Sequence, residues 1–112
     1  MMHWKENFRK MNNDKILGML GLAARARKIT AGTEIVTERI KSGKGVKLVL
    51  IASDVSENTF KKIVNCCEYY GIDHISLQYT QDELSHAIGK MCLTSSVAIM
   101  DRNFAEAVKK LI

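Results

Sequence analysis

Almost every residue is apolar in two short stretches of the chain, residues 46–52 and residues 96–100. Apolar runs of this length, rich in β-branched residues, are typical of strands covered on both faces. Residues 29–31 and 73–77 are further short segments with the composition of strands. The pattern therefore predicts a sheet of about four strands.

Between these strands, apolar residues recur at helical spacing, three or four positions apart. The predicted helices cover residues 13–25, 33–42, 56–70, 80–88 and 103–112. Their predicted buried positions are Ile16, Leu17, Leu20 and Ala24; Val36 and Ile40; Phe60, Ile63, Val64 and Cys67; Leu84, Ala87 and Ile88; and Phe104, Val108 and Leu111. Gly18 and Gly21 weaken the first helix, which indicates close packing or a helix that needs its neighbours.

Polar residues stand where several of these helices begin. Ser56 or Asn58 starts the third helix. Thr80 and Glu83 have the spacing of a capping box, a hydroxyl at the cap with a carboxylate three residues later. Asn103 is the predicted cap of the last helix.

Strands alternate with helices, which predicts an α/β fold: a three-layer α/β/α sandwich around a small mixed sheet. A chain of 112 residues without an internal repeat, linker or low-complexity tract fits one domain. We therefore expect a single domain over residues 13–112. Residues 1–12 form an N-terminal leader, which is either a loose chain or a short helix with Trp4 and Phe8 on one face.

The composition is that of a soluble globular protein, with 46% hydrophobic and 26% charged residues. The longest unbroken aliphatic run, residues 48–52, is too short to cross a bilayer. The first residues contain no apolar stretch of signal-peptide length. We therefore expect a cytoplasmic protein that does not enter a membrane.

Metal binding and catalysis have little support in the sequence. Adjacent Cys66 and Cys67 point to different helix faces and are not spaced as metal ligands, so Cys67 is expected in the core. Asp54 and Asp101 each follow an apolar strand, but no nucleophile–base pair accompanies them, which favours turn or cap roles. We expect no metal, no cofactor and no enzymatic activity.

Charge is distributed unevenly along the chain. Residues 1–47 contain eleven of the seventeen Lys and Arg residues and four of the twelve acidic residues, whereas residues 48–112 contain six and eight. The net charges of the two parts are therefore +7 and −2. A basic half on a small domain is the electrostatic pattern expected of a polyanion-binding protein.

The basic half contains one segment, residues 25–42, that combines cations with a predicted helix start at Gly32. A helix N-terminus has free backbone N–H groups and a partial positive charge, which suit phosphate or base acceptors. Cations around such an end favour nucleic acid; the plain alternative is a solvated surface helix. The candidate residues are Arg25, Arg27, Lys28, Gly32, Thr33, Glu34, Thr37, Glu38 and Lys41.

The same segment, G-L-A-A-R-A-R-K-I-T-A-G-T-E-I-V-T-E-R-I-K-S, resembles the ribosomal kink-turn RNA-binding protein family. S-E-N-T-F-K-K-I, D-E-L-S-H-A-I-G-K and S-S-V-A-I-M-D-R-N-F-A are similar to its bacterial YlxQ-type branch. The similarity covers roughly residues 14–112 in collinear order. The resemblance implies a three-layer α/β/α fold that binds sharply bent RNA at the start of the second helix.

The family pattern at this helix is Gly-x-Asn-Glu-x-x-Lys, and this chain departs from it. When Gly32 and Gly43 are aligned, the Asn, Glu and Lys positions hold Glu34, Ile35 and Glu38. A carboxylate at Glu34 can still accept hydrogen bonds from a guanine edge, whereas Ile35 accepts none. Glu38 would repel a phosphate, a cost that salt reduces.

The chain lacks the cation that the family pattern has at its Lys position, and either of two other cations in the segment can replace it. Lys28 at the helix entrance and Lys41 further along the helix are the candidates. The family's second contact is an apolar loop that packs on the protruding nucleotide. Met91 and Leu93 fit this role, and a loop covering the edge of the core remains the alternative.

The sequence thus predicts a non-catalytic RNA-binding protein, ribosomal or ribosome-associated. Its expected partners are structured RNA, either ribosomal RNA or another kink-turn RNA, and ribosomal or translation-associated proteins. The alternative is a protein–protein interaction module on the same fold, which Ile35 and Glu38 favour because they replace RNA-contacting residues of the family. An enzyme is a third, weaker hypothesis.

Overall fold

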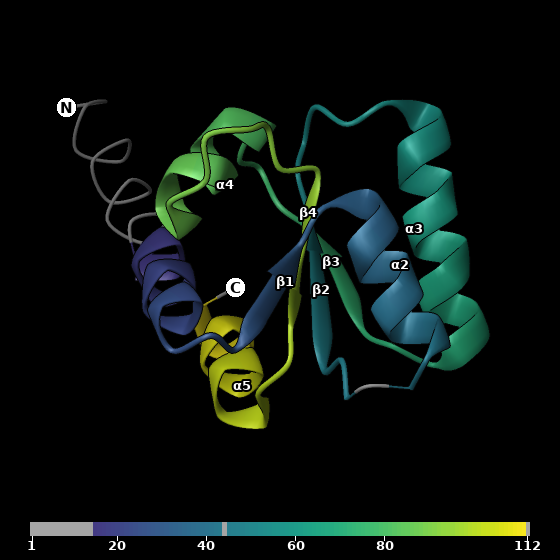
Figure 1. Ribbon diagram of the computed structural model, residues 1–112, viewed down its shortest axis with the longest axis horizontal. Helices are drawn as coiled ribbons and strands as arrows, with labels where there is room; N and C mark the ends of the chain where they lie inside the picture. Colours follow the sequence, from purple (N-terminus) through teal and green to yellow (C-terminus); the bar gives the residue numbers. More distant parts are fainter. Residues whose placement is uncertain (1–14, 44, 112) are drawn as a thin grey trace, which may run out of the picture.

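A mixed four-stranded sheet lies at the centre of the computed structural model, which describes residues 15–43 and 45–111 (Figure 1). The strands are β1 (Ile29–Ala31), β2 (Leu48–Ile51), β3 (His74–Ser76) and β4 (Ser96–Ile99), in the order β1-β4-β2-β3. β4 is antiparallel to both of its neighbours, whereas β2 and β3 are parallel. The predicted small mixed sheet is confirmed. The predicted leader, residues 1–12, lies outside the described residues.

Because β1 and β2 both run opposite to β4, β1, β2 and β3 all point the same way. Each of these strands is followed by a helix: α2 (Thr33–Lys41), α3 (Glu57–Tyr70) and α4 (Gln81–Ile88). All three helices therefore begin on one side of the sheet, which we call its carboxyl end. The opposite side, where β1, β2 and β3 begin and β4 ends, is its amino end.

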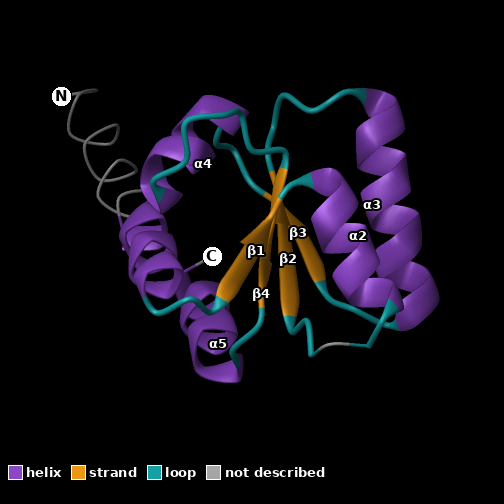
Figure 2. Cartoon of the chain, in the orientation of Figure 1, coloured by secondary structure: helices purple, strands orange, loops and turns teal. Residues whose placement is uncertain are grey.

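Helices cover both faces of the sheet and form the predicted α/β/α sandwich (Figure 2). α2 and α3 pack on one face, and the first helix (residues 15–25), α4 and α5 (Arg102–Leu111) pack on the other. Side chains of β2 alternate between the two cores: Leu48 and Leu50 face one, Val49 and Ile51 the other. All four are fully buried because both faces are covered. No described helix is long and apolar enough to span a membrane.

The caps show why α3 and α4 begin where they do. The Ser56 hydroxyl accepts a hydrogen bond from the Thr59 backbone N–H at 3.2 Å. The capping box of α4 is confirmed: the Thr80 hydroxyl accepts from the Glu83 N–H at 3.2 Å, and the Glu83 carboxylate accepts from the Thr80 N–H at 3.0 Å. These bonds satisfy donors that a helix start leaves free.

The prediction that Asn103 caps the last helix is wrong. α5 begins at Arg102, and the Asp101 carboxylate accepts a hydrogen bond from the Phe104 N–H at 3.2 Å. β4 ends at Ile99, so the helix can start before the predicted cap at Asn103. Asp54 similarly accepts a hydrogen bond from the Gln81 N–H at 2.8 Å, so both aspartates have the predicted structural roles.

One predicted buried position, Phe60, is wrong. Ala24 is only partly buried, because the fully buried stripe of the first helix runs through Ile16, Leu20 and Ala23. Phe60 is 37% exposed, because the first turn of α3 extends beyond the ends of the strands (Figure 1). The core of this layer rests on Ile63, Cys66 and Cys67 further along α3, so the predicted core position of Cys67 is confirmed.

Gly21 is a point of close approach between the first helix and α4. A Cβ atom at Gly21 would lie 3.0 Å from the carbonyl oxygen of Ala87, whereas one at Gly18 would meet nothing within 4 Å. The close packing expected of these glycines is therefore confirmed for Gly21 alone.

Candidate nucleic-acid interface

The N-terminus of α2 lacks the side-chain cap that α3 and α4 have at the same end of the sheet. Its N-cap residue is Gly32, with φ 103°, and no side chain among residues 15–43 and 45–111 forms a cap hydrogen bond with the first turn. A side chain is strained at this φ, which explains the glycine. The leading N–H groups of α2 are therefore available to a ligand, and the helix dipole makes this end favourable for anions.

The start of α2 opens into a cavity of ≈ 430 Å³ at the carboxyl end. Its lining residues are Gly32, Thr33, Val55, Ser56, Thr59, Gln81, Leu93 and Ser95. The structure thus brings three predicted residues, Gly32, Thr33 and Leu93, together from two distant segments. The hydroxyl and amide groups beside them were not predicted. The sequence has no signal for them, because the start of α3, the start of α4 and the loop before β4 meet only in the folded chain.

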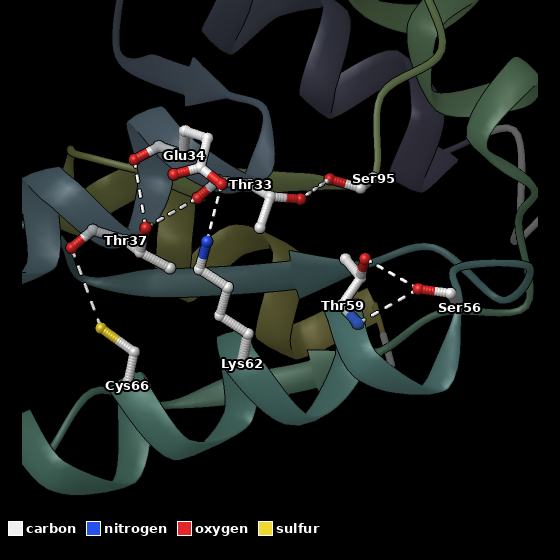
Figure 3. Close-up of polar contacts among 8 residues, drawn as sticks. All are labelled: Thr33, Glu34, Thr37, Ser56, Thr59, Lys62, Cys66 and Ser95. Carbon is white, nitrogen blue, oxygen red and sulfur yellow. Dashed lines mark hydrogen bonds and ion pairs between the residues drawn. The ribbon is translucent and has the colours of Figure 1, made fainter.

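Hydroxyl groups link the parts of this site (Figure 3). The Thr33 and Ser95 hydroxyl oxygens lie 2.6 Å apart, which ties the start of α2 to the loop before β4. The Thr37 hydroxyl lies 2.9 Å from the Thr33 carbonyl oxygen and 3.1 Å from that of Glu34, and its side chain is buried. Thr37, a predicted contact residue, therefore uses its hydroxyl inside the helix.

A cation that the sequence did not indicate stands beside the first turn of α2. Lys62, on α3, forms an ion pair with Glu34 at 2.6 Å (Figure 3). The hydrogen bond and the charge of Lys62 lower the pKa of the Glu34 carboxyl group. Both side chains are exposed, and exposed pairs of this kind contribute little to stability. Lys62 thus places a positive charge beside Glu34 in the first turn of α2.

The predicted cations do not surround the start of α2. The Lys28 carbonyl oxygen accepts a hydrogen bond from the Met100 N–H at 2.7 Å, whereas the Gly32 N–H donates to the Ser96 carbonyl oxygen at 3.0 Å. Lys28 and Gly32 therefore lie at opposite ends of the sheet, separated by the length of β1, about 10 Å.

Other predicted cations also lie away from the start of α2. Arg25 and Arg27 precede Lys28 at the amino end, and Lys41 is the last residue of α2. The structure therefore does not bring Arg25, Arg27, Lys28 and Lys41 together with Gly32, and their contact with RNA stays a prediction. The length of β1 separates Arg25, Arg27 and Lys28 from the start of α2. The length of α2 separates Lys41 from it.

Apolar side chains are exposed at the carboxyl end. Met91 is fully exposed and Leu93 is 67% exposed, so neither covers the core. Ile35, in the first turn of α2, is half-exposed, and Glu38 is exposed one turn further along. No group of three His, Cys, Asp or Glu side chains that could hold a metal ion occurs among the residues described.

The chain is similar in sequence to two bacterial RNA-binding proteins. It is 36% identical over 94 residues to the RNA-binding protein YlxQ of Bacillus subtilis (strain 168), covering 84% of this chain and 91% of that protein. It is 36% identical over 101 residues to the RNA-binding protein YlxQ of Enterococcus faecium, covering 90% and 94%. The predicted resemblance to the YlxQ-type branch is confirmed.

Solved structures share the fold. A Bacillus halodurans protein of unknown function superposes with a TM-score of 0.79 and 34% identity, over 87% of this chain and 95% of that one. A Giardia lamblia 15.5kD RNA-binding protein superposes with a TM-score of 0.71 and 18% identity, over 90% and 84%. A model of one protein family matches residues 14–109. The chain therefore belongs to the ribosomal protein L7Ae/L30e/S12e/Gadd45 family.

Proposed function

We propose that this protein binds folded RNA, and that the start of α2 docks into a sharply bent RNA of the kink-turn type. The uncapped N-terminus of α2, which opens into a cavity rich in hydroxyl groups, is the observation that carries the proposal. The relatives named as RNA-binding proteins support an RNA ligand. The protein performs no reaction in this role, and its place is in the cytoplasm.

The groups at this site match the chemistry of an unstacked RNA segment. The N–H groups of the first turn of α2 donate to phosphate or base acceptors. The Glu34 carboxylate accepts from the Watson–Crick edge of a guanine, and the hydroxyls of Thr33 and Ser95 can donate or accept. Because shape and splayed bases are features of bent RNA, this set favours a bent ligand over a straight duplex.

Lys62 has two roles in this proposal. In the free protein it is paired with Glu34 at 2.6 Å. When RNA arrives, the exposed pair opens at small cost, Glu34 turns to the base and Lys62 to a phosphate. Lys62 therefore replaces the lysine that the family pattern has at the position of Glu38.

The exposed loop before β4 supplies an apolar contact. Met91 and Leu93 pack on a nucleotide that protrudes from the bend, which removes apolar surface of both partners from water. Ile35 adds apolar surface on the α2 side. The ligand is ribosomal RNA or another structured RNA, and ribosomal or translation-associated proteins are the neighbours expected around it.

A binding titration tests the proposal. The protein is titrated against a kink-turn RNA and a straight duplex of equal charge, and tighter binding of the bent RNA is expected. Lys62→Ala should weaken binding of the bent RNA. Lys61→Ala is the matched control, because Lys61 is the neighbouring residue and is likewise exposed and ion-paired, with Glu57 at 3.2 Å. Equal affinity for both RNAs would remove the shape-specific part of the proposal.

A protein–protein interaction module is the second candidate, and the exposure of Ile35 beside Glu38 favours it. An exposed apolar side chain beside an acidic one suits a protein surface better than a phosphate backbone. Partners that stay bound after ribonuclease treatment, and are lost with Ile35→Ser, would support this role. Partners released by ribonuclease would exclude it for this face.

A further inference from the structure

Two lysines flank the end of β4 at the amino end of the sheet. The Lys28 carbonyl oxygen accepts from the Met100 N–H at 2.7 Å on one side of β4, and the Lys47 N–H donates to the Ile99 carbonyl oxygen at 2.8 Å on the other. Their backbones are thus two strand spacings apart, about 10 Å. Both side chains are exposed, so one cation lies on each side of the end of β4.

More cations gather at the same end of the sheet. The six exposed members of this cluster, which we call the amino-end cluster, are Arg25, Arg27, Lys28, Arg39, Lys41 and Lys47. None of the six forms an ion pair with a residue in the described part of the chain, although five ion pairs occur elsewhere in it.

Two acidic groups at the amino end are already engaged, and Glu38, beside Arg39 on α2, can offset only one of the six charges. Asp101 accepts from the Phe104 N–H and thereby caps α5, and Asp73 is paired with Lys109 at 2.6 Å. The charge of the amino-end cluster is therefore not neutralised by these neighbours.

A structural role explains only part of the cluster. Cations in the last turn of a helix are stabilised by the helix dipole, which accounts for Arg25, Arg39 and Lys41. It does not account for Lys28 and Lys47, which stand at strand starts. Nor does it account for Arg27, which has a φ of 59°, a conformation that an L-residue adopts at a cost. Glycine would adopt this conformation without strain, so the backbone does not require an arginine at this position.

We infer that the amino-end cluster is a second RNA-contacting surface, which binds the phosphate backbone of a stem flanking the segment held at the carboxyl end. The inference rests on the proposed function in that it takes the ligand to be RNA. β2 spans about 13 Å between the two ends. One turn of a nucleic-acid duplex, about 34 Å, is longer than this, so a single RNA can reach both. The contact is to phosphates and carries no sequence preference.

The salt dependence of RNA binding tests this inference. The double variant Lys28→Ala/Lys47→Ala is compared with the wild type on a kink-turn RNA that has full-length stems. Each phosphate contact contributes a slope of roughly 0.7 to 0.9 in a plot of log K against log salt. The double variant should therefore lose roughly 1.4 to 1.8 from the slope. Its preference for bent over straight RNA should be retained.

The matched control is Lys15→Ala/Lys110→Ala, which removes the same charge from exposed positions of the first helix and α5. It should leave the slope within about 0.5 of the wild-type value, since a net-charge effect alone is small. Circular dichroism confirms that both double variants are folded. An unchanged slope in Lys28→Ala/Lys47→Ala, or an equal loss in the control, would overturn the inference.

The two measurements distinguish a failure of this inference from a failure of the proposed function. If the wild type binds bent and straight RNA equally but the slope still falls in Lys28→Ala/Lys47→Ala, the bent-RNA proposal fails and the second surface stands. If the bent RNA is preferred and the slope does not fall, the second surface fails alone. If the wild type binds neither RNA, both are wrong.

Discussion

Replacing Arg27 with glycine should make the protein more stable, although it removes a charged side chain. Arg27 is the second residue after the end of the first helix and has a φ of 59°. Its N–H donates to the Ala24 carbonyl oxygen at 3.0 Å, and the Lys28 N–H donates to that of Ala23 at 2.9 Å. These two bonds are those of a Schellman motif, whose left-handed position is most often glycine.

The magnitude follows from the backbone conformation. A left-handed conformation costs an L-residue about 1 to 2 kcal/mol, and glycine has no such cost but loses more entropy on folding, about 0.5 to 1 kcal/mol. The net gain expected for Arg27→Gly is therefore about 1 kcal/mol. For a domain of this size it corresponds to a rise in Tm of about 4 °C.

Urea unfolding followed by circular dichroism measures this gain, with Arg25→Gly as the matched control. Arg25 is an exposed residue in the last helical turn and carries the same charge, but its backbone is helical, so glycine there should cost about 0.5 to 1 kcal/mol. The two variants should thus shift stability in opposite directions with the same m value. A loss of stability in both would refute the explanation from backbone strain.

Other positions give equally direct tests of stability. Gly18→Ala should add about 1 kcal/mol by helix propensity. Gly21→Ala should be at least 1 kcal/mol less stable than Gly18→Ala, because its Cβ would lie 3.0 Å from the Ala87 carbonyl oxygen; similar unfolding midpoints would contradict the contact. Ser96→Ala should add about 1 kcal/mol, because the buried Ser96 hydroxyl has no hydrogen-bond partner in the part of the chain that the structure describes; a loss of stability would show that it has one. Burial raises the pKa of the Cys67 thiol from 9.0 to about 11. Between these values the unfolded chain binds fewer protons, so stability should fall as pH rises through this window, and less steeply in Cys67→Ala. Identical pH profiles in urea unfolding would refute this.

The layers of the fold could be predicted because they follow from local patterns. The apolar runs of β2 and β4, the helical spacing between strands and the capping box at Thr80 each express a property of neighbouring residues. Element ends were less predictable. Asp101 and Asn103 are both good cap residues, and only the end of β4 decides between them.

The candidate site could be predicted only in part, because it depends on which end of the sheet each residue occupies. The sequence places Lys28 four residues before Gly32, but β1 is extended and carries them apart. Lys62 is 28 residues from Glu34 and pairs with it because α2 and α3 pack side by side. Neither relation has a local signal in the sequence.

The strand order has a consequence for how the carboxyl end of the sheet is assembled. Within the described chain, β1 pairs with β4 alone, and the Gly32 N–H bonds to Ser96 at the start of β4. A fragment that ends before residue 90 would keep the whole basic segment and every cation in it. It would have no strand to anchor β1, no partner for the Thr33 hydroxyl and no loop with Leu93. The cavity at the start of α2 is thus completed only when β4 and the loop before it have joined the sheet, so its assembly depends on contacts between residues far apart in the sequence.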